Sequence, residues 1–267
     1  MPIPWRQILT SPATFALMSA HVGYNWCFMM FLIETPAYLS AELQIDVASS
    51  SYLSALPFAA KWILSIVFGF ACEYTYNRKY LTVTASRKLF NSIGTFGVAA
   101  GLIALSFLNS QQGLAAVALI AASAGLQSAV AIENLSQSLP LGSSIVSGWD
   151  KFSYREIGSF SFMQMNHIDV SPNFGGLIFS VNNFVANLIS IAEPVFTATI
   201  LGDDSNVSRW RIVFFTSAGL SVLSNFIYVI WGTAERQPWD CPHPVSESVN
   251  FDVLKEENTQ SEANTHS

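Results

Sequence analysis

The chain has 267 residues, a formal net charge of -6 and only 11% charged residues, whereas typical soluble domains carry about 25%. Hydrophobic residues make up 51% of it, which is typical of a protein that is partly surrounded by lipid. No basic patch interleaved with aromatic residues occurs, and this argues against a nucleic-acid partner. The three cysteines lack metal-type or redox spacing. We therefore expect buried free thiols, no metal site and no cofactor.

Long apolar runs dominate the chain. A helix needs about 20 mostly apolar residues to cross a membrane, and six stretches reach that length. They predict an all-α integral membrane bundle with both termini on the same side. The expected spans are 13–33, 50–72, 89–108, 113–132, 174–201 and 212–234.

The basic residues between these spans predict the orientation. If the N-terminus is cytoplasmic, nine Lys and Arg residues lie inside and only Arg209 and Arg211 lie outside, as the positive-inside rule requires. Asn206 then begins an exoplasmic glycosylation sequon, Asn-Val-Ser. We expect segment 1–12 to be a cytoplasmic linker. The polar, acidic segment 235–267 is expected to be a disordered cytoplasmic tail.

Small residues are concentrated in two of the predicted spans, as "GTFGVAAG" (94–101) and "ALIAASAGL" (118–126). In lipid, helices associate through close packing because hydrophobic exclusion does not distinguish a helix from a lipid tail. These segments therefore predict a tightly packed bundle.

Several motifs, in order along the chain, resemble one transporter family. They are "PWRQILTSP" with "AHVGYNWCFMMFLIETPAYL", then "YLSALPF", "SRKLFNSIG", "NHIDVSPNFGG", and "WRIVFF" with "GTAERQPW". They resemble the C-terminal half of the anion–cation symporters of the major facilitator superfamily, which include sialin, the vesicular glutamate transporters and the sodium-dependent phosphate cotransporters. The resemblance implies a six-helix half of a twelve-helix bundle, without its N-terminal six-helix half.

The resemblance also implies a function. It implies a secondary active transporter rather than an enzyme, moving an organic anion or inorganic phosphate with Na⁺ or H⁺ by alternating access. The expected partners are membrane lipid, the small anionic substrate, the coupling ion and the missing half, in the plasma membrane or in a lysosomal or vesicular membrane. The alternative is a non-transporting membrane fragment or partner-binding half, because six of the family's twelve spans are missing.

One segment departs from the family pattern. Residues 130–157 contain five charged residues and cannot continue a lipid-facing helix. They are interpreted either as a cytoplasmic insertion or as an unspliced segment. The expected organisation is then four spans within 13–129, this segment, and the remainder of the fourth helix with spans five and six within 158–234.

Polar residues inside the spans are the candidate substrate ligands, because a charge in mid-membrane costs at least about 2.5 kcal/mol. Lys61, near the middle of the second expected span, would neutralise an anion; the alternatives are a snorkelling lysine or a structural ion pair. Tyr24 and Asn25 match the family's "YNW" core. Asn182 and Asn183 resemble a polar pair in the family, and would either orient the substrate or bond neighbouring helices.

Three further residues are candidates for ion coupling. Glu34 stands at the exoplasmic end of the first expected span and is either a coupling carboxylate or an interfacial charge. Glu193 precedes Pro194, which should bend its helix. His21 shares a helix face with Tyr24 and is either a structural histidine or a proton relay.

Two groups of residues are expected at the cytoplasmic side. Asn166, His167 and Asp169 resemble a family segment that closes one helix and leads into the next, so a polar helix end is expected there instead of a catalytic site. Gly69, Glu73 and Arg78 resemble the superfamily's loop motif of glycine, acid and base, which latches neighbouring helices. A plain basic loop that obeys the positive-inside rule explains them equally well.

Overall fold

The computed structural model describes residues 3–41, 52–108, 110–132, 165–202 and 207–240, and within these ranges it is helical without strands. The expected all-α membrane fold is therefore confirmed. The elements are α1 (Trp5–Thr10), α2 (Pro12–Met29), the π-helix η1 (Met30–Glu34), α3 (Thr35–Ala41), α5 (Leu56–Asn77), α6 (Val83–Leu105), η2 (Ser110–Gln112), α7 (Gly113–Ile132), α9 (Met165–Val170), α10 (Gly175–Ser190), α11 (Ala192–Leu201), α12 (Val207–Trp231) and η4 (Pro238–Asp240).

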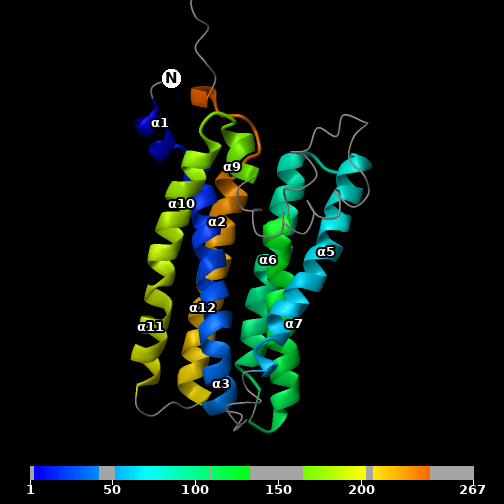
Figure 1. Ribbon diagram of the computed structural model, residues 1–267, viewed down its shortest axis with the longest axis vertical. Helices are drawn as coiled ribbons and strands as arrows, with labels where there is room; N and C mark the ends of the chain where they lie inside the picture. Colours follow the sequence, from blue (N-terminus) through cyan, green and yellow to red (C-terminus); the bar gives the residue numbers. More distant parts are fainter. Residues whose placement is uncertain (1–2, 42–51, 109, 133–164, 203–206, 241–267) are drawn as a thin grey trace, which may run out of the picture.

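The long helices run side by side in two groups (Figure 1). Helix α2 packs against α10 and α12, while α7 packs against both α5 and α6. The two groups meet where α6 packs on α12. Element α1 near the N-terminus and η4 lie at the same end of the bundle (Figure 1), which agrees with an even number of crossings.

Five of the expected six spans are long and apolar enough to cross a membrane among the residues described. They are Pro12–Ala41, Val83–Leu105, Gly113–Val130, Gly175–Leu201 and Ser208–Trp231. The apolar part of α5, Leu56–Cys72, is shorter than the others. Large apolar side chains such as Phe184, Leu188 and Ile230 are more than half exposed on the outside of the bundle, as expected for surfaces that face lipid.

Helix α5 begins six residues later than the span predicted from residue 50, and it runs on to Asn77. Pro57 occupies its first turn, where a missing backbone N–H costs nothing. Lys61 therefore lies in the second turn of α5 and not at its middle. Helix α6 begins at Val83, well before the predicted residue 89, because the Thr82 hydroxyl caps it by accepting a hydrogen bond from the Ala85 N–H at 3.2 Å.

The first span continues beyond its expected end at residue 33. Between α2 and α3, Met30–Glu34 form a π-helix. Pro36 lacks an N–H and its ring would collide with the carbonyl four residues back in an α-helix. A π-turn just before it widens the helix and lets the chain remain helical to Ala41. Glu34 is consequently buried inside the span instead of lying at its exoplasmic end.

The bend expected at Pro194 is confirmed as a break in the helix at Ile191, between α10 and α11. The proline ring excludes the carbonyl of residue 190 from regular helical geometry.

Glycines allow α6 and α7 to approach closely, as their small-residue segments predicted. A β-carbon at Gly94 would lie 2.6 Å from Val130 Cγ2 and 3.0 Å from the Leu126 carbonyl oxygen. At Gly97 it would lie 2.7 Å from Leu126 Cδ1. Gly94 therefore has no room for a side chain against the α7 backbone, whereas at Gly97 the Leu126 side chain would have to move.

Helix α7 contains 20 residues, which corresponds to about 30 Å. It has the length of a span without the segment 158–165 that we expected to complete it. Residues 130–132 of the expected insertion belong to α7, and 133–164 lie outside the described residues.

Candidate functional site

Lys61 of α5 reaches across to α2 and α7. Its Nζ donates hydrogen bonds to the Tyr24 hydroxyl at 2.8 Å and to Gln127 Oε1 at 3.2 Å. The ammonium also lies 4.7 Å from the centre of the Tyr24 ring and 4.5 Å from that of Phe28, close enough for cation–π attraction. All of these partners are neutral. Among the described residues, no carboxylate forms an ion pair with Lys61.

The two aromatic rings and Gln127 are held in place by contacts of their own. Tyr24 and Phe28 lie one helical turn apart on α2 and stack with an interplanar angle of 3°. Phe58 of α5 packs its edge against Phe28. Gln127 Nε2 donates to the Tyr24 carbonyl oxygen at 3.0 Å. Because the amide nitrogen of Gln127 makes this bond, the amide oxygen is the atom that faces Lys61.

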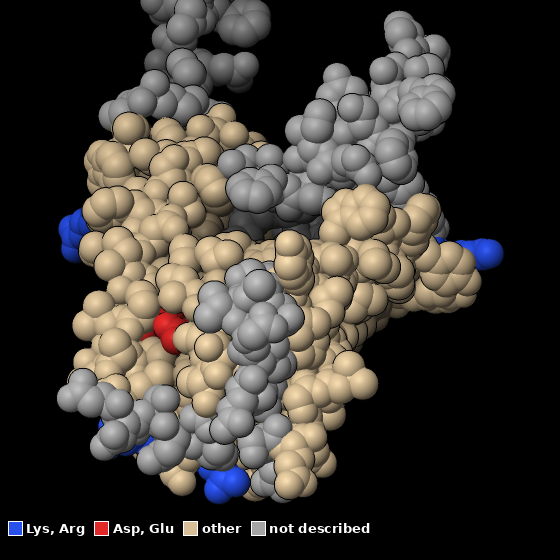
Figure 2. All heavy atoms as spheres, turned by 60° about the horizontal axis from the view of Figure 1, so that its bottom comes forward, with Lys and Arg blue, Asp and Glu red and all other residues tan. Residues whose placement is uncertain are grey.

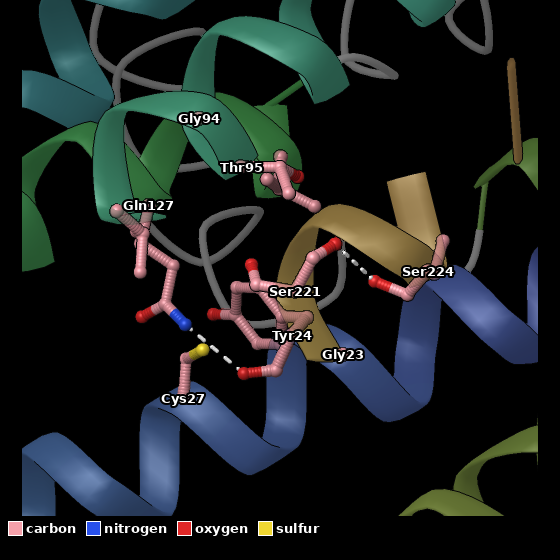
Figure 3. A pocket seen from close by; sticks show the side chains of 11 residues that line it. Gly23, Tyr24, Cys27, Gly94, Thr95, Gln127, Ser221 and Ser224 are labelled. Carbon is pink, nitrogen blue, oxygen red and sulfur yellow. Dashed lines mark hydrogen bonds between the residues drawn. The ribbon is translucent and has the colours of Figure 1, made fainter. Parts of the chain in front are cut away.

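A small polar cavity lies beside this cluster, between α2, α6, α7 and α12 (Figure 3). Tyr24 and Gln127 line it on one side, and the hydroxyls of Thr95, Ser221 and Ser224 approach it from α6 and α12. Its volume of about 10 Å³ is enough for roughly one water molecule. The cavity therefore extends the polar surroundings of Lys61 into the bundle.

A second polar pair, Glu34 and Glu193, is buried where η1 packs against α11. Glu34 of η1 is 8% exposed and Glu193 of α11 is 0% exposed. Thr197 donates a hydrogen bond to Glu193 Oε1 at 3.0 Å, whereas Glu193 Oε2 has no hydrogen-bond partner among the described residues. Glu34 belongs to η1, which packs directly against the helix α11 that carries Glu193. We call these two residues the carboxylate pair.

His21 and His167 form a third cluster, between α2, α9 and α10. Their ring centroids are 6.4 Å apart, and Phe179 packs against both rings. Asn182 Nδ2 lies 2.9 Å from His167 Nε2, and Asn183 Oδ1 accepts a hydrogen bond from Asn187 Nδ2 at 3.0 Å. Asn182 therefore contacts a histidine and Asn183 a neighbour on its own helix, and neither is among the hydrogen-bond partners of Lys61 in the described part of the chain. Asn25 is buried on α2 apart from both groups.

At the α9 end of the bundle, polar residues tie the turn between α9 and α10 to its neighbours. Asn166 donates to the Tyr228 hydroxyl at 2.7 Å. Asp169 forms an ion pair with Arg87 of α6, whose side chain is only 2% exposed. Burial raises the pKa of Asp169 above its usual range, and the neighbouring guanidinium opposes that rise.

The carboxylate of Asp240 in η4 closes the same turn. It accepts hydrogen bonds from the Ser171 hydroxyl and from the Asn173 backbone N–H at 3.1 Å, and it pairs with Arg236. The "NHIDVSPNFGG" segment thus forms a helix end with the chain's later residues packed on it.

The remaining predicted residues are placed as follows. Gly69 is half-buried on α5, and exposed Arg78 lies over the Tyr74 ring, 5.6 Å from its centre. The Glu73 side chain and the whole of Asn206 lie outside the described residues. Among the described residues, no group of three or more potential ligands could hold a metal ion.

Three residues important to these clusters were not singled out from the sequence. Gln127 gave a weak signal as an amide within an apolar run, and such residues are candidates by default. Arg87 was counted only as a loop charge because α6 was expected to begin after it. Phe28 carried no signal, since an aromatic residue in a span is ordinary.

Comparison with known proteins gives a consistent set of relatives, although no family model matches the chain. A Drosophila ananassae protein named "Putative inorganic phosphate cotransporter" is 30% identical over 243 residues, covering 90% of this chain. Human sialin is 27% identical over 89% of the chain, and human vesicular glutamate transporter 2 is 25% identical over 95%. This chain spans 44%, 42% and 39% of these relatives, respectively.

Proposed function

We propose that this chain is one half of a secondary active transporter for an organic anion or inorganic phosphate, of the anion–cation symporter family of the major facilitator superfamily. The relatives match it over about nine tenths of its length. The relatives are named as transporters of phosphate, and as sialin and a glutamate transporter. A multi-pass helical membrane bundle fits this assignment. The membrane itself would be the plasma membrane or that of a vesicle or lysosome.

The observation that carries the proposal is the set of contacts made by Lys61. A lysine that served only structure in a membrane would be expected to pair with a carboxylate or reach the interface. Lys61 instead donates to a phenol and an amide of the neighbouring helices, and no described carboxylate forms an ion pair with it. Such an arrangement favours the binding of an anion.

We propose that the anion binds against Lys61 at the face where this half meets an N-terminal half. The neighbouring cavity, with room for about one water, is smaller than a phosphate ion. A site between two halves also suits alternating access, since rocking of one half against the other exposes it to each side in turn. Coupling to Na⁺ or H⁺ would supply the driving force.

The test is uptake of radiolabelled phosphate, sialic acid and glucuronate into proteoliposomes that contain this chain together with a matching N-terminal six-helix half. Lys61→Ala should reduce uptake at least about tenfold, equivalent to a loss of about 1.4 kcal/mol of binding free energy. Lys61→Arg, which retains the charge, should retain more uptake than Lys61→Ala.

Lys88 provides the matched control, because it is a half-exposed lysine on α6 away from the cluster. Lys88→Ala should transport as well as the unaltered chain. Unchanged uptake in Lys61→Ala would remove Lys61 from the site. If no anion is taken up by the unaltered protein, the non-transporting, partner-binding alternative is favoured instead.

A further inference from the structure

The carboxylate pair lies apart from Lys61 and its anion site. Glu34 comes from the π-helix η1 and Glu193 from α11, and these two elements pack against each other. Trp26 and Cys27 of α2 pack at the same place, where Trp26 contacts Phe196 of α11 and donates to the Ser217 hydroxyl of α12 at 3.1 Å. Two further helices, α2 and α12, therefore pack around the pair.

Two ionised carboxylates in such a position would be very unfavourable. Each would lose its hydration, and in a low-dielectric interior they would also repel each other. Hydrogen bonding compensates only part of this cost, because Thr197 serves one oxygen of Glu193 while Oε2, fully buried, has no partner among the described residues. A bound cation would remove both penalties.

The surrounding charged and titratable groups do not supply that cation. Tyr38 of α3 lines the same cavity as Glu34, and Cys27 is buried on the adjoining α2; neither a phenol nor a thiol can carry a positive charge. At the start of α12, Arg211 donates to the Ser106 carbonyl oxygen at 2.7 Å and Arg209 to that of Leu201. Both guanidinium groups are thus engaged with backbone carbonyl oxygens.

We propose that Glu34 and Glu193 form one coupled proton-binding site that holds a single proton. One proton from water adds to the pair and changes its charge from two negative to one. A proton suits the site better than Na⁺, because the other described side chains lining the cavity beside Glu34 are apolar apart from Thr35 and Tyr38, whereas a metal cation needs several oxygen ligands.

The site has space for water beside it. A cavity of about 10 Å³ lies beside Glu34 and is lined by residues of η1, α3, α6, α7 and α12, including Tyr38, Leu105 and Phe214. It has room for about one water molecule. Seen from the α3 end, the described surface is largely uncharged, with an acidic spot recessed in it (Figure 2). In the transporter proposed above, on which this step rests, binding and release of the proton would couple its gradient to anion movement.

Infrared titration of the purified chain in lipid nanodiscs tests the proton site directly. The absorbance of protonated carboxyl groups should fall in two separate steps for the unaltered pair, because coupled groups differ by about 1 pH unit or more. The upper step should be absent in Glu34→Gln and in Glu193→Gln alike. Glu235→Gln, which alters an exposed carboxylate, should leave it unchanged.

Two results would overturn the proposal. One is an upper step that survives in both single variants, since the two groups would then titrate independently. The other is loss of the protonated-carboxyl signal when Na⁺ replaces choline at constant pH, since sodium would then be the bound cation. The titration does not depend on transport. If the chain titrates in coupled steps but takes up no anion, the proposed function is contradicted and the proton site is not.

Discussion

At the residue scale, the functional candidates are defined by which neutral or charged group each one meets. Lys61 contacts a phenol, an amide and two aromatic rings, whereas Glu193 lies on a helix packed against the segment that carries Glu34. Both arrangements leave a charge that a small ion would neutralise. Arg87 shows the opposite case, because its buried guanidinium is already matched by Asp169.

Asp169→Asn should destabilise the protein by about 3 kcal/mol, the lower end of the cost of removing one partner from a buried ion pair, since Asp169 is a quarter exposed. The amide leaves the buried Arg87 without a compensating charge. Thermal unfolding in detergent, followed by circular dichroism, would measure the loss.

A double replacement, Arg87→Met with Asp169→Leu, should recover most of this stability because neither charge then remains. If the double variant is no more stable than Asp169→Asn, the ion pair is not the reason for the loss. Arg78→Ala, at an exposed position, should change stability by less than about 0.5 kcal/mol.

At the element scale, local sequence decides where helices start, break and approach. Pro57 lies in the first turn of α5, Pro36 follows the π-helix, and Pro194 follows the helix break at Ile191. The π-helix ends at Glu34, so the same irregularity that continues the first span also carries one member of the carboxylate pair. Glycines then determine which helices can lie in contact.

Gly94→Ala should destabilise the bundle by about 1–3 kcal/mol, because the new methyl group would overlap Val130 and the α7 backbone. Gly219→Ala is the matched control, since a β-carbon there meets no atom within 4 Å. That change should be neutral or stabilising by up to about 1 kcal/mol, through alanine's higher helix propensity. Equal unfolding temperatures for both variants would contradict close α6–α7 packing at Gly94.

At the scale of the whole molecule, the described chain begins and ends at one end of a helical bundle (Figure 1). Together with the distribution of basic residues, this predicts that both termini are cytoplasmic and that the loop around residue 206 is exoplasmic. The structure does not place a membrane, so the orientation stays a prediction.

Expression in cells with different epitope tags at the two termini tests this topology. Both tags should be protected from antibody in intact cells and should become accessible once the plasma membrane alone is permeabilised. The chain should also carry a glycan that is lost in Asn206→Gln. Tags on opposite sides of the bilayer would contradict an even number of crossings.

Much of the architecture was predictable because its causes are local. Apolar runs of about 20 residues predict membrane helices, since a helix satisfies its own backbone hydrogen bonds in lipid. Helix ends were less accurate: the expected start of α6 missed the Thr82 cap, and the expected end of the first span missed the π-helix. The positions of charges and prolines alone do not determine the residue at which such a helix begins or ends.

The sequence by itself determined that this is an all-helical membrane bundle and marked Lys61, Glu34, Glu193 and His21 as candidates, because polar groups are conspicuous in apolar runs. Only the tertiary structure decided their partners. Lys61 lies 37 residues from Tyr24 and 66 from Gln127. Spans that are apolar on nearly all sides do not encode how each helix is rotated against its neighbours, so these side-chain contacts follow from helix packing.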